Sequence, residues 1–202
     1  MSKIKPNYTK CIVIVHGWSE KQICEYIKTN LRFPMEIVSE AKGKNSIQIN
    51  DLQNLFTKDH RFKNKSNLLN HFSGIEIVTE NKKKQIAPYF KIFIIVDTDD
   101  CTKEQKNKYI SKELFRKYWL HDYIVPIYNT PDLENVLTKA GIKFTKKGNE
   151  RKKEYIKIFP TSPKYKNSES VELNEFEKNL EKINETNMNE FIKFCLTNRL
   201  IQ

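Results

Sequence analysis

The sequence predicts an α/β fold in which a mostly parallel sheet is flanked by helices, with a helical insertion and a helical C-terminal appendage. Two apolar runs support this prediction, Cys-Ile-Val-Ile-Val at residues 11–15 and Lys-Ile-Phe-Ile-Ile-Val at residues 91–96. Such runs are typical of strands buried on both faces of a parallel sheet. Each run is followed by a polar turn and then by apolar residues at helical spacing, so strands and helices alternate along the chain.

The first run opens a predicted βαβ unit. Ser19 is suited to cap a helix, because a serine hydroxyl can accept a backbone N–H of the first helical turn. The helix itself is predicted from apolar residues at four-residue spacing, namely Ile23, Ile27 and Leu31. Pro34 ends this helix, and residues 35–39 form a short second strand.

The remaining elements follow from the same patterns of spacing. They are helices over 47–74, a strand over 75–78, a basic loop over 81–84, a strand over 91–96, a helix over 103–119 and a strand over 123–128. Pro131 is expected in the first turn of a further helix, which ends at Gly141. That helix would bury Leu133, Val136 and Leu137.

Two regions are predicted along the chain. Residues 1–142 form the α/β domain, and residues 143–202 form a basic linker and an amphipathic helix or helix pair. The apolar positions of this C-terminal part are Leu173, Phe176, Leu180, Ile183, Phe191 and Cys195.

The charge of the chain favours polyanionic partners. Among 202 residues, 36 Lys and Arg outnumber 25 Asp and Glu, which gives a formal net charge of +11. The residues expected to contact DNA or RNA are Lys82, Lys83, Lys84, Lys146, Lys147 and Arg151. The rings expected to stack on bases are Phe62, Tyr89, Phe144 and Tyr155. The alternative is that the basic residues only solvate the surface and that the rings anchor loops.

Cysteine spacing and hydropathy exclude several classes of protein. Cys11, Cys24, Cys101 and Cys195 form no Cys-x-x-Cys pair, so they are expected to be reduced thiols rather than zinc ligands or disulfides. The N-terminus shows no hydrophobic signal segment, and no apolar run approaches the roughly 20 residues that span a bilayer. A cytoplasmic protein without membrane contact is therefore expected.

Polar residues follow both of the strongest predicted strands. His16 and Glu20 come after residues 11–15, and Asp97, Asp99 and Asp100 come after residues 91–96. The carboxyl ends of parallel strands share one edge of the sheet, so these side chains are expected to meet. Clustered carboxylates repel one another unless a cation such as Mg²⁺ or Mn²⁺ keeps them ionised. The alternative is that the aspartates only turn the chain and cap the next helix.

These motifs resemble those of the TOPRIM domains, within the nuclease branch of OLD-family and RloB-like proteins. Val15-His16-Gly17-Trp18-Ser19-Glu20 is similar to the family's Glu-Gly-x-x-(Asp/Glu) motif, and Asp97-Thr98-Asp99 is similar to its Asp-x-Asp motif. Residues 129–134, Asn-Thr-Pro-Asp-Leu-Glu, resemble the Asn-Pro-x-x-Glu-like segment of RloB-like proteins. The resemblance covers about residues 8–142 and implies a Rossmann-like topology.

The resemblance implies a divalent-metal-dependent nuclease that cuts a phosphodiester of DNA or RNA in bacterial antiviral defence. A partner ATPase would be a separate subunit, because the chain has no Gly-x-x-x-x-Gly-Lys-(Ser/Thr) motif, and a homo-oligomer is compatible with this function. The resemblance implies that Asp97 and Asp99 bind Mg²⁺ or Mn²⁺. Asp100 and Glu20 would bind a second ion or its waters. Glu134 would have a supporting role. His16, which stands where the family has glutamate, would be a base or ligand and suits Mn²⁺ better than Mg²⁺.

Two alternatives remain at this stage. In the first, the chain is a catalytically degenerate TOPRIM-like module that binds nucleic acid or serves as a scaffold. In the second, the strand-terminal Asp-x-Asp pattern carries out aspartyl-phosphate chemistry in a phosphotransfer enzyme.

Overall fold

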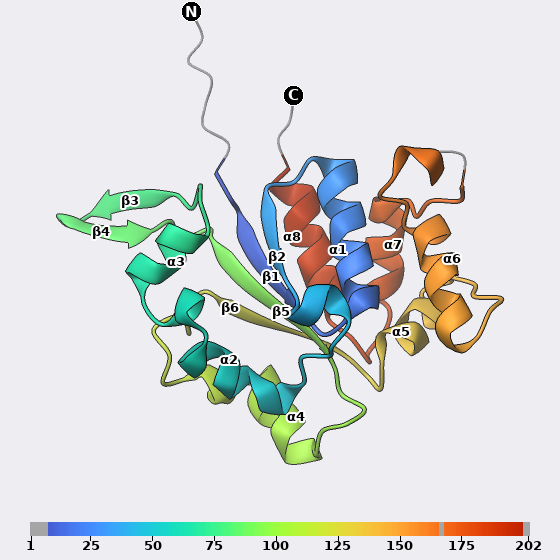
Figure 1. Ribbon diagram of the computed structural model, residues 1–202, viewed down its shortest axis with the longest axis horizontal. Helices are drawn as coiled ribbons and strands as arrows, with labels where there is room; N and C mark the ends of the chain where they lie inside the picture. Colours follow the sequence, from blue (N-terminus) through green and yellow to red (C-terminus); the bar gives the residue numbers. More distant parts are fainter. Residues whose placement is uncertain (1–7, 166–167, 200–202) are drawn as a thin grey trace, which may run out of the picture.

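A computed structural model describes residues 8–165 and 168–199 of the chain (Figure 1). Its centre is a four-stranded sheet with the order β2-β1-β5-β6, in which every neighbouring pair is parallel. The strands are β1 (Cys11–Val15), β2 (Met35–Val38), β5 (Lys91–Asp97) and β6 (Ile124–Asn129). Helices flank this sheet, so the predicted α/β class is confirmed.

Alternating side chains of the central strands face two separate hydrophobic clusters. Val13 of β1 belongs to one cluster and Ile14 to the other, as expected where successive side chains point to opposite faces. All five residues of β1 are fully buried. This burial on both faces explains why an uninterrupted apolar run marks the strand.

One face of the sheet is covered by α1 and the C-terminal half of the chain, and the other by shorter helices. The first layer contains α1 (Trp18–Leu31), α5 (Leu133–Lys139), α6 (Arg151–Ile158), α7 (Leu173–Leu180) and α8 (Met188–Thr197). The second contains α2 (Leu52–Lys58), α3 (Lys65–His71) and α4 (Lys103–Ile110). Figure 1 shows α1, α7 and α8 on one side of the sheet and α2 and α4 on the other.

The C-terminal segment forms a helix pair that shares the hydrophobic cluster of β1, β5 and α1. All six apolar positions expected to be buried in this segment are buried. The connection between α7 and α8 also covers the outer edge of β6. There the side chain of Asn187 accepts the N–H of Tyr128 at 3.0 Å and donates to the carbonyl of Pro126 at 3.0 Å. Asn187 thereby replaces part of a missing neighbouring strand.

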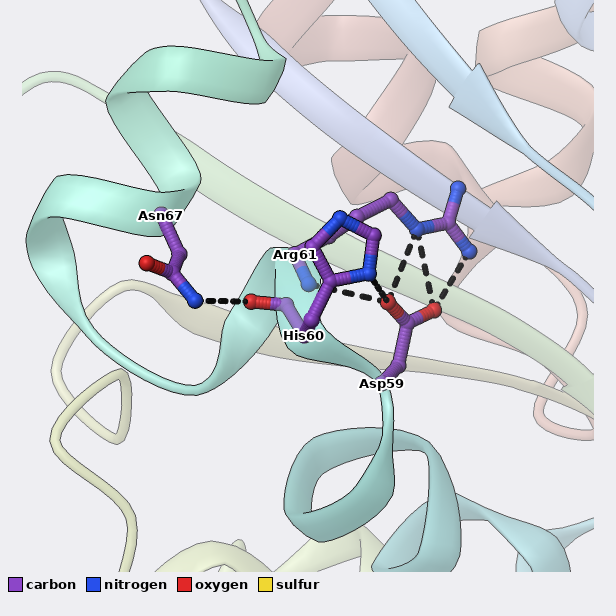
Figure 2. A network of polar contacts seen from close by, with 4 residues as sticks. All are labelled: Asp59, His60, Arg61 and Asn67. Carbon is purple, nitrogen blue, oxygen red and sulfur yellow. Dashed lines mark hydrogen bonds and ion pairs between the residues drawn. The ribbon is translucent and has the colours of Figure 1, made fainter.

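Residues 47–74 form short helices on the second face. Figure 2 shows the corner between α2 and α3, where the Asp59 carboxylate accepts the backbone N–H of Arg61 at 2.9 Å and an Arg61 guanidinium N–H at 2.6 Å. Asn67 of α3 donates to the carbonyl of His60 at 2.8 Å. These contacts hold the turn between the two helices in one conformation.

The predicted helix over 103–119 is too long. The α-helix ends at Ile110, and Lys112 adopts a left-handed conformation with φ 64° before a 3₁₀ turn at Glu113–Phe115. Tyr109 and Phe115 are both fully buried, and the break allows both rings to reach the second cluster. No glycine or proline marks this break in the sequence, so it could not be read from turn signals.

The predicted basic loop over 81–84 is also wrong. Strands β3 (Ile77–Glu80) and β4 (Lys83–Ile86) form an antiparallel hairpin, and only Asn81 and Lys82 form its turn. Both turn residues have positive φ, 51° and 64°, as a type I′ hairpin turn requires. The hairpin extends away from the sheet (Figure 1). It begins close to a bridge between Ile75 and Thr9, at the amino ends of β1 and β5.

Two helix starts also differ from the prediction. Helix α1 begins at Trp18 with Gly17 as its N-cap, so Ser19 lies inside the helix rather than at its cap. Helix α5 begins at Leu133 with Asp132 as its N-cap, so Pro131 precedes the helix and follows a cis peptide bond. In the described residues, no helix is long and apolar enough to cross a membrane.

Candidate active site

The order of the sheet places a switch point between β1 and β5. From β1 the chain crosses over α1 to β2 on one side, and it later adds β5 and β6 on the other side. Helices α1 and α4 consequently cover opposite faces. In open α/β sheets, ligands bind outside the carboxyl ends of the strands at such a point.

The predicted meeting of the two strand ends is found at this switch point. Strands β1 and β5 are paired in parallel, and the N–H of His16 donates to the carbonyl of Ile95 at 2.8 Å. Asp97 is the last residue of β5. The turn of residues 16–20 and the Asp97 side chain therefore share one edge of the sheet.

Glu20 folds back onto the turn that precedes its own helix. Its Oε2 atom accepts the backbone N–H of Gly17 at 2.9 Å, and its side chain is buried with 2% exposed. A Cβ atom added to Gly17 would lie 3.4 Å from Glu20 Oε2, which is van der Waals contact, so the bond to the Glu20 carboxylate does not depend on glycine at this position. The turn thus holds a buried carboxylate at the switch point.

Asp97 is held by the neighbouring strand and helix. Its Oδ1 atom accepts the backbone N–H of Leu133, the first residue of α5, at 3.0 Å and the amide of Asn129 at 3.3 Å. The side-chain oxygen of Asn129 in turn accepts the hydroxyl of Thr186 at 3.0 Å, which orients the amide nitrogen toward Asp97. Sequence reasoning missed Thr186, because it lies 57 residues from Asn129 along the chain.

Ionisation of the two buried carboxyl groups is unfavourable in this position. Burial raises the pKa of Glu20, and the neighbouring charge of Glu134 raises it further. Burial likewise raises the pKa of Asp97, and the negative charge of Glu20 adds to this shift. A divalent cation next to both groups would offset their repulsion and keep them ionised.

His16 is fixed in one tautomer by the loop that follows β2. Its Nδ1 atom lies 3.1 Å from the carbonyl oxygen of Ile47. A carbonyl can only accept, so Nδ1 carries the hydrogen and Nε2 keeps its lone pair in the neutral ring. A carbonyl partner of this kind is also the usual support of a metal-binding histidine.

Glu134 joins three helices at the same edge. Its Oε1 atom accepts the hydroxyl of Ser19 in α1 at 3.3 Å and the hydroxyl of Tyr155 in α6 at 3.2 Å. Tyr155 is buried with 1% exposed, so it anchors α6 and cannot stack on bases as the sequence suggested. Phe62 is equally buried, and the same correction applies to it. The alternative in which these two rings serve as anchors is what the structure shows.

Asp99 and Asp100 lie in the exposed turn after β5. The cap of α4 is Thr102, whose hydroxyl accepts the N–H of Gln105 at 3.2 Å, so neither aspartate caps that helix. In residues 8–165 and 168–199, no three His, Cys, Asp or Glu side chains are grouped so that they could hold a metal ion. The described residues therefore contain no ready-made centre of three such ligands.

A smaller donor set nevertheless suits Mg²⁺ or Mn²⁺. Mg²⁺ is commonly bound through one or two carboxylates, together with waters and substrate phosphates. Glu20 and Asp97 supply two hard oxygen donors at the switch point, and His16 supplies a nitrogen that Mn²⁺ accepts. The donors at this edge are of the kinds that Mg²⁺ and Mn²⁺ accept, but they are fewer than a cage of protein ligands requires.

The two predicted basic clusters lie in different places. Lys146, Lys147 and Arg151 lie at or just before α6, and the guanidinium of Arg151 is 5.4 Å from the centre of the Phe144 ring. From Phe144, ring contacts lead through Tyr155 to Trp18 in the site turn. The second cluster, Lys82–Lys84, is in the hairpin. Figure 1 shows the hairpin and α6 on opposite sides of the molecule.

Comparisons with family models, curated proteins and solved structures give no match to this chain. The interpretation of the site therefore rests on its own geometry and on the two motifs that resemble those of TOPRIM domains.

Proposed function

We propose that this protein is a divalent-metal-dependent nuclease of the TOPRIM type that acts on a nucleic-acid phosphodiester. The observation that carries the proposal is the pair of buried carboxylates, Glu20 and Asp97, next to His16 at the switch point of a parallel sheet. Burying two like charges together is unfavourable without a compensating cation, so the arrangement suggests that an ion binds there.

Each residue of the site has a distinct proposed role. Glu20 and Asp97 would hold the ion, and Asp99 and Asp100 could add ligands from the exposed turn. A bound Mg²⁺ or Mn²⁺ would polarise the scissile phosphate and lower the pKa of bound water. The single lone pair of His16 Nε2 would serve either as a ligand to the ion or as acceptor of a proton from the attacking water. Asn129 orients Asp97, and Glu134 fixes α1 against α5 and α6.

Cleavage by the purified protein tests this proposal. Labelled single- and double-stranded DNA and RNA would be incubated with Mn²⁺, with Mg²⁺ or with EDTA. We expect cleavage with Mn²⁺ and none with EDTA. The resemblance also suggests a role in bacterial antiviral defence together with a partner ATPase, so the same assay would be repeated with a candidate ATPase from the same genomic neighbourhood.

Nucleic-acid affinity is expected to fall steeply with salt, because lysine and arginine contacts to phosphates release counterions. Changing Lys146, Lys147 and Arg151 together to glutamine should reduce the slope of log K against log salt by about 2 for a single strand. The matching triple change of Lys82–Lys84 should have a smaller effect, because the hairpin lies at the amino edge of the sheet. Fluorescence anisotropy measures the salt dependence of binding for wild type and for both triple variants. A flat salt response would contradict nucleic-acid binding.

The role proposed for His16 predicts a change in metal preference. His16→Ala should lower cleavage by about 10²-fold or more, because the proton acceptor or metal ligand is lost. His16→Glu should remain active and favour Mg²⁺ more strongly, since a carboxylate is the harder ligand. His121→Ala is the matched control, because His121 lies before β6 at the other edge of the sheet. Rates with each metal check the prediction, which is wrong if His16→Ala cleaves like wild type.

A non-catalytic function is the second candidate. It is favoured by the lack of a three-ligand metal group in the described residues and by His16 in the position of the family's glutamate. In that case the protein would bind nucleic acid or a partner through its basic faces. This candidate gains support if no cleavage appears with any substrate and metal, even with the ATPase supplied, while salt-sensitive binding persists.

A further inference from the structure

Lys106 of α4 lies at the same carboxyl edge as the buried carboxylates. Its Nζ atom donates to the hydroxyl oxygen of Thr130, one residue after β6, at 2.8 Å. It also lies 5.5 Å from the centre of the Tyr128 ring. A hydroxyl and an aromatic face thus hold the half-buried ammonium group in place.

Hydrogen bonds connect this lysine to the end of β5. Thr98, the residue after Asp97, donates its hydroxyl to the same Thr130 oxygen at 3.0 Å. The backbone N–H of Thr98 donates to the carbonyls of Asn129 and Pro131, at 3.0 Å and 2.9 Å. The position of the Lys106 ammonium is therefore fixed relative to the strand that carries Asp97.

The charge of Lys106 has no acidic partner in the described part of the chain. By contrast, Lys108 of the same helix pairs with Glu104 at 2.6 Å. An ammonium group has three N–H donors, and Thr130 uses one of those of Lys106. Positive charge and donors thus remain for an anion at this edge.

The proposed metal site does not by itself compensate the charge of the substrate. One divalent cation neutralises only the two charges of the ionised Glu20 and Asp97, so a phosphodiester beside them still needs a positive group. We propose that Lys106 binds a phosphate oxygen of the nucleic-acid substrate beside the strand end that carries Asp97. This inference rests on the proposed nuclease function and adds a substrate-contacting residue to it.

Steady-state kinetics with Mn²⁺ and a labelled oligonucleotide test the proposal. A charged hydrogen bond to phosphate is lost in Lys106→Met, so kcat/KM should fall by about 10- to 100-fold. Lys106→Arg keeps the charge and should stay within about fivefold of wild type. Lys108→Met is the matched control from the exposed side of α4 and should behave like wild type. Equal rates for Lys106→Met and Lys108→Met would overturn the proposal and leave the nuclease function standing.

A second measurement does not depend on cleavage. Inorganic phosphate would be titrated into ¹⁵N-labelled protein at constant ionic strength, and the amide resonances of Thr98, Lys106 and Thr130 would be followed. These resonances should shift in wild type and in Lys106→Arg, and should not shift in Lys106→Met. If wild type is inert as a nuclease but shows this pattern, the phosphate contact is supported and the nuclease function fails. If phosphate causes no shift in an inert wild type, both proposals are overturned.

Discussion

Asp97→Ala is expected to abolish metal-dependent cleavage while nucleic-acid binding stays close to that of wild type. The change removes one of two buried carboxylates at the switch point, and the loss of a ligand to the ion should lower kcat by at least about 10³-fold. The exposed basic residues at α6 are untouched, so affinity measured by anisotropy should change little.

Two further variants separate loss of the ligand from loss of the fold. Asp97→Asn keeps an oxygen that can accept the Leu133 N–H but removes the negative charge, and it should be as inactive as Asp97→Ala. Asp122→Asn removes an exposed carboxylate just before β6, at the other edge of the sheet, and should retain full activity. If Asp97→Asn cleaves at the wild-type rate with Mn²⁺, the buried carboxylates are not the metal site.

The exposed turn offers a related comparison. The resemblance to TOPRIM domains implies that Asp99 is a ligand, whereas in the structure Asp97 is buried and Asp99 is exposed. Asp99→Asn should abolish the proposed cleavage if the turn closes on the ion. Retained activity would mean that Glu20, Asp97 and the substrate suffice to hold the ion.

The central sheet was predictable because its strands are buried on both faces. A run such as residues 11–15 can then be apolar at every position, which is a strong signal. The hairpin was harder to predict, because Ile77, Lys83 and Lys84 are exposed and no buried face imposes a pattern. The break after Ile110 was missed for another reason. The position of the break depends on how Tyr109 and Phe115 pack in the core, and this tertiary packing leaves no local signal in the sequence.

Part of the candidate site was predictable from topology alone. Parallel strands bring their carboxyl ends to one edge, so His16, Glu20 and Asp97 could be grouped from their place after a strand. Thr186 and Lys106 were not assigned to the site, and Tyr155 was expected to stack on bases rather than to bind Glu134. Each of these side chains reaches the site from a helix or connection whose position depends on tertiary packing.

The contribution of Glu20 and Asp97 to the stability of the metal-free protein should fall as the pH rises from about 4 to about 8. Burial raises the pKa of Glu20 and Asp97 in the folded state, so the folded protein binds more protons than the unfolded chain in this range. The stabilisation that comes from these two protonated groups is fully present below the ordinary pKa of a carboxyl group. It is lost as the pH rises toward the raised pKa values of the folded state. The groups that face this pair are Glu134 of α5 and Asp132 at its N-cap, which oppose ionisation, and His16, which favours it.

The Asp97→Asn variant isolates this contribution, because an amide does not titrate. Relative to wild type in EDTA, the variant should gain stability with rising pH, on the order of a few kcal/mol or about 5–10 °C in Tm at pH 8. Mn²⁺ should stabilise wild type more at pH 8 than at pH 5, because the ion competes with protons for the carboxylates, and it should have little effect on the variant. Thermal unfolding followed by circular dichroism across this range provides the measurement. A difference between variant and wild type that does not change with pH would mean that Asp97 is already ionised without metal, and the electrostatic case for an ion at this edge would be lost.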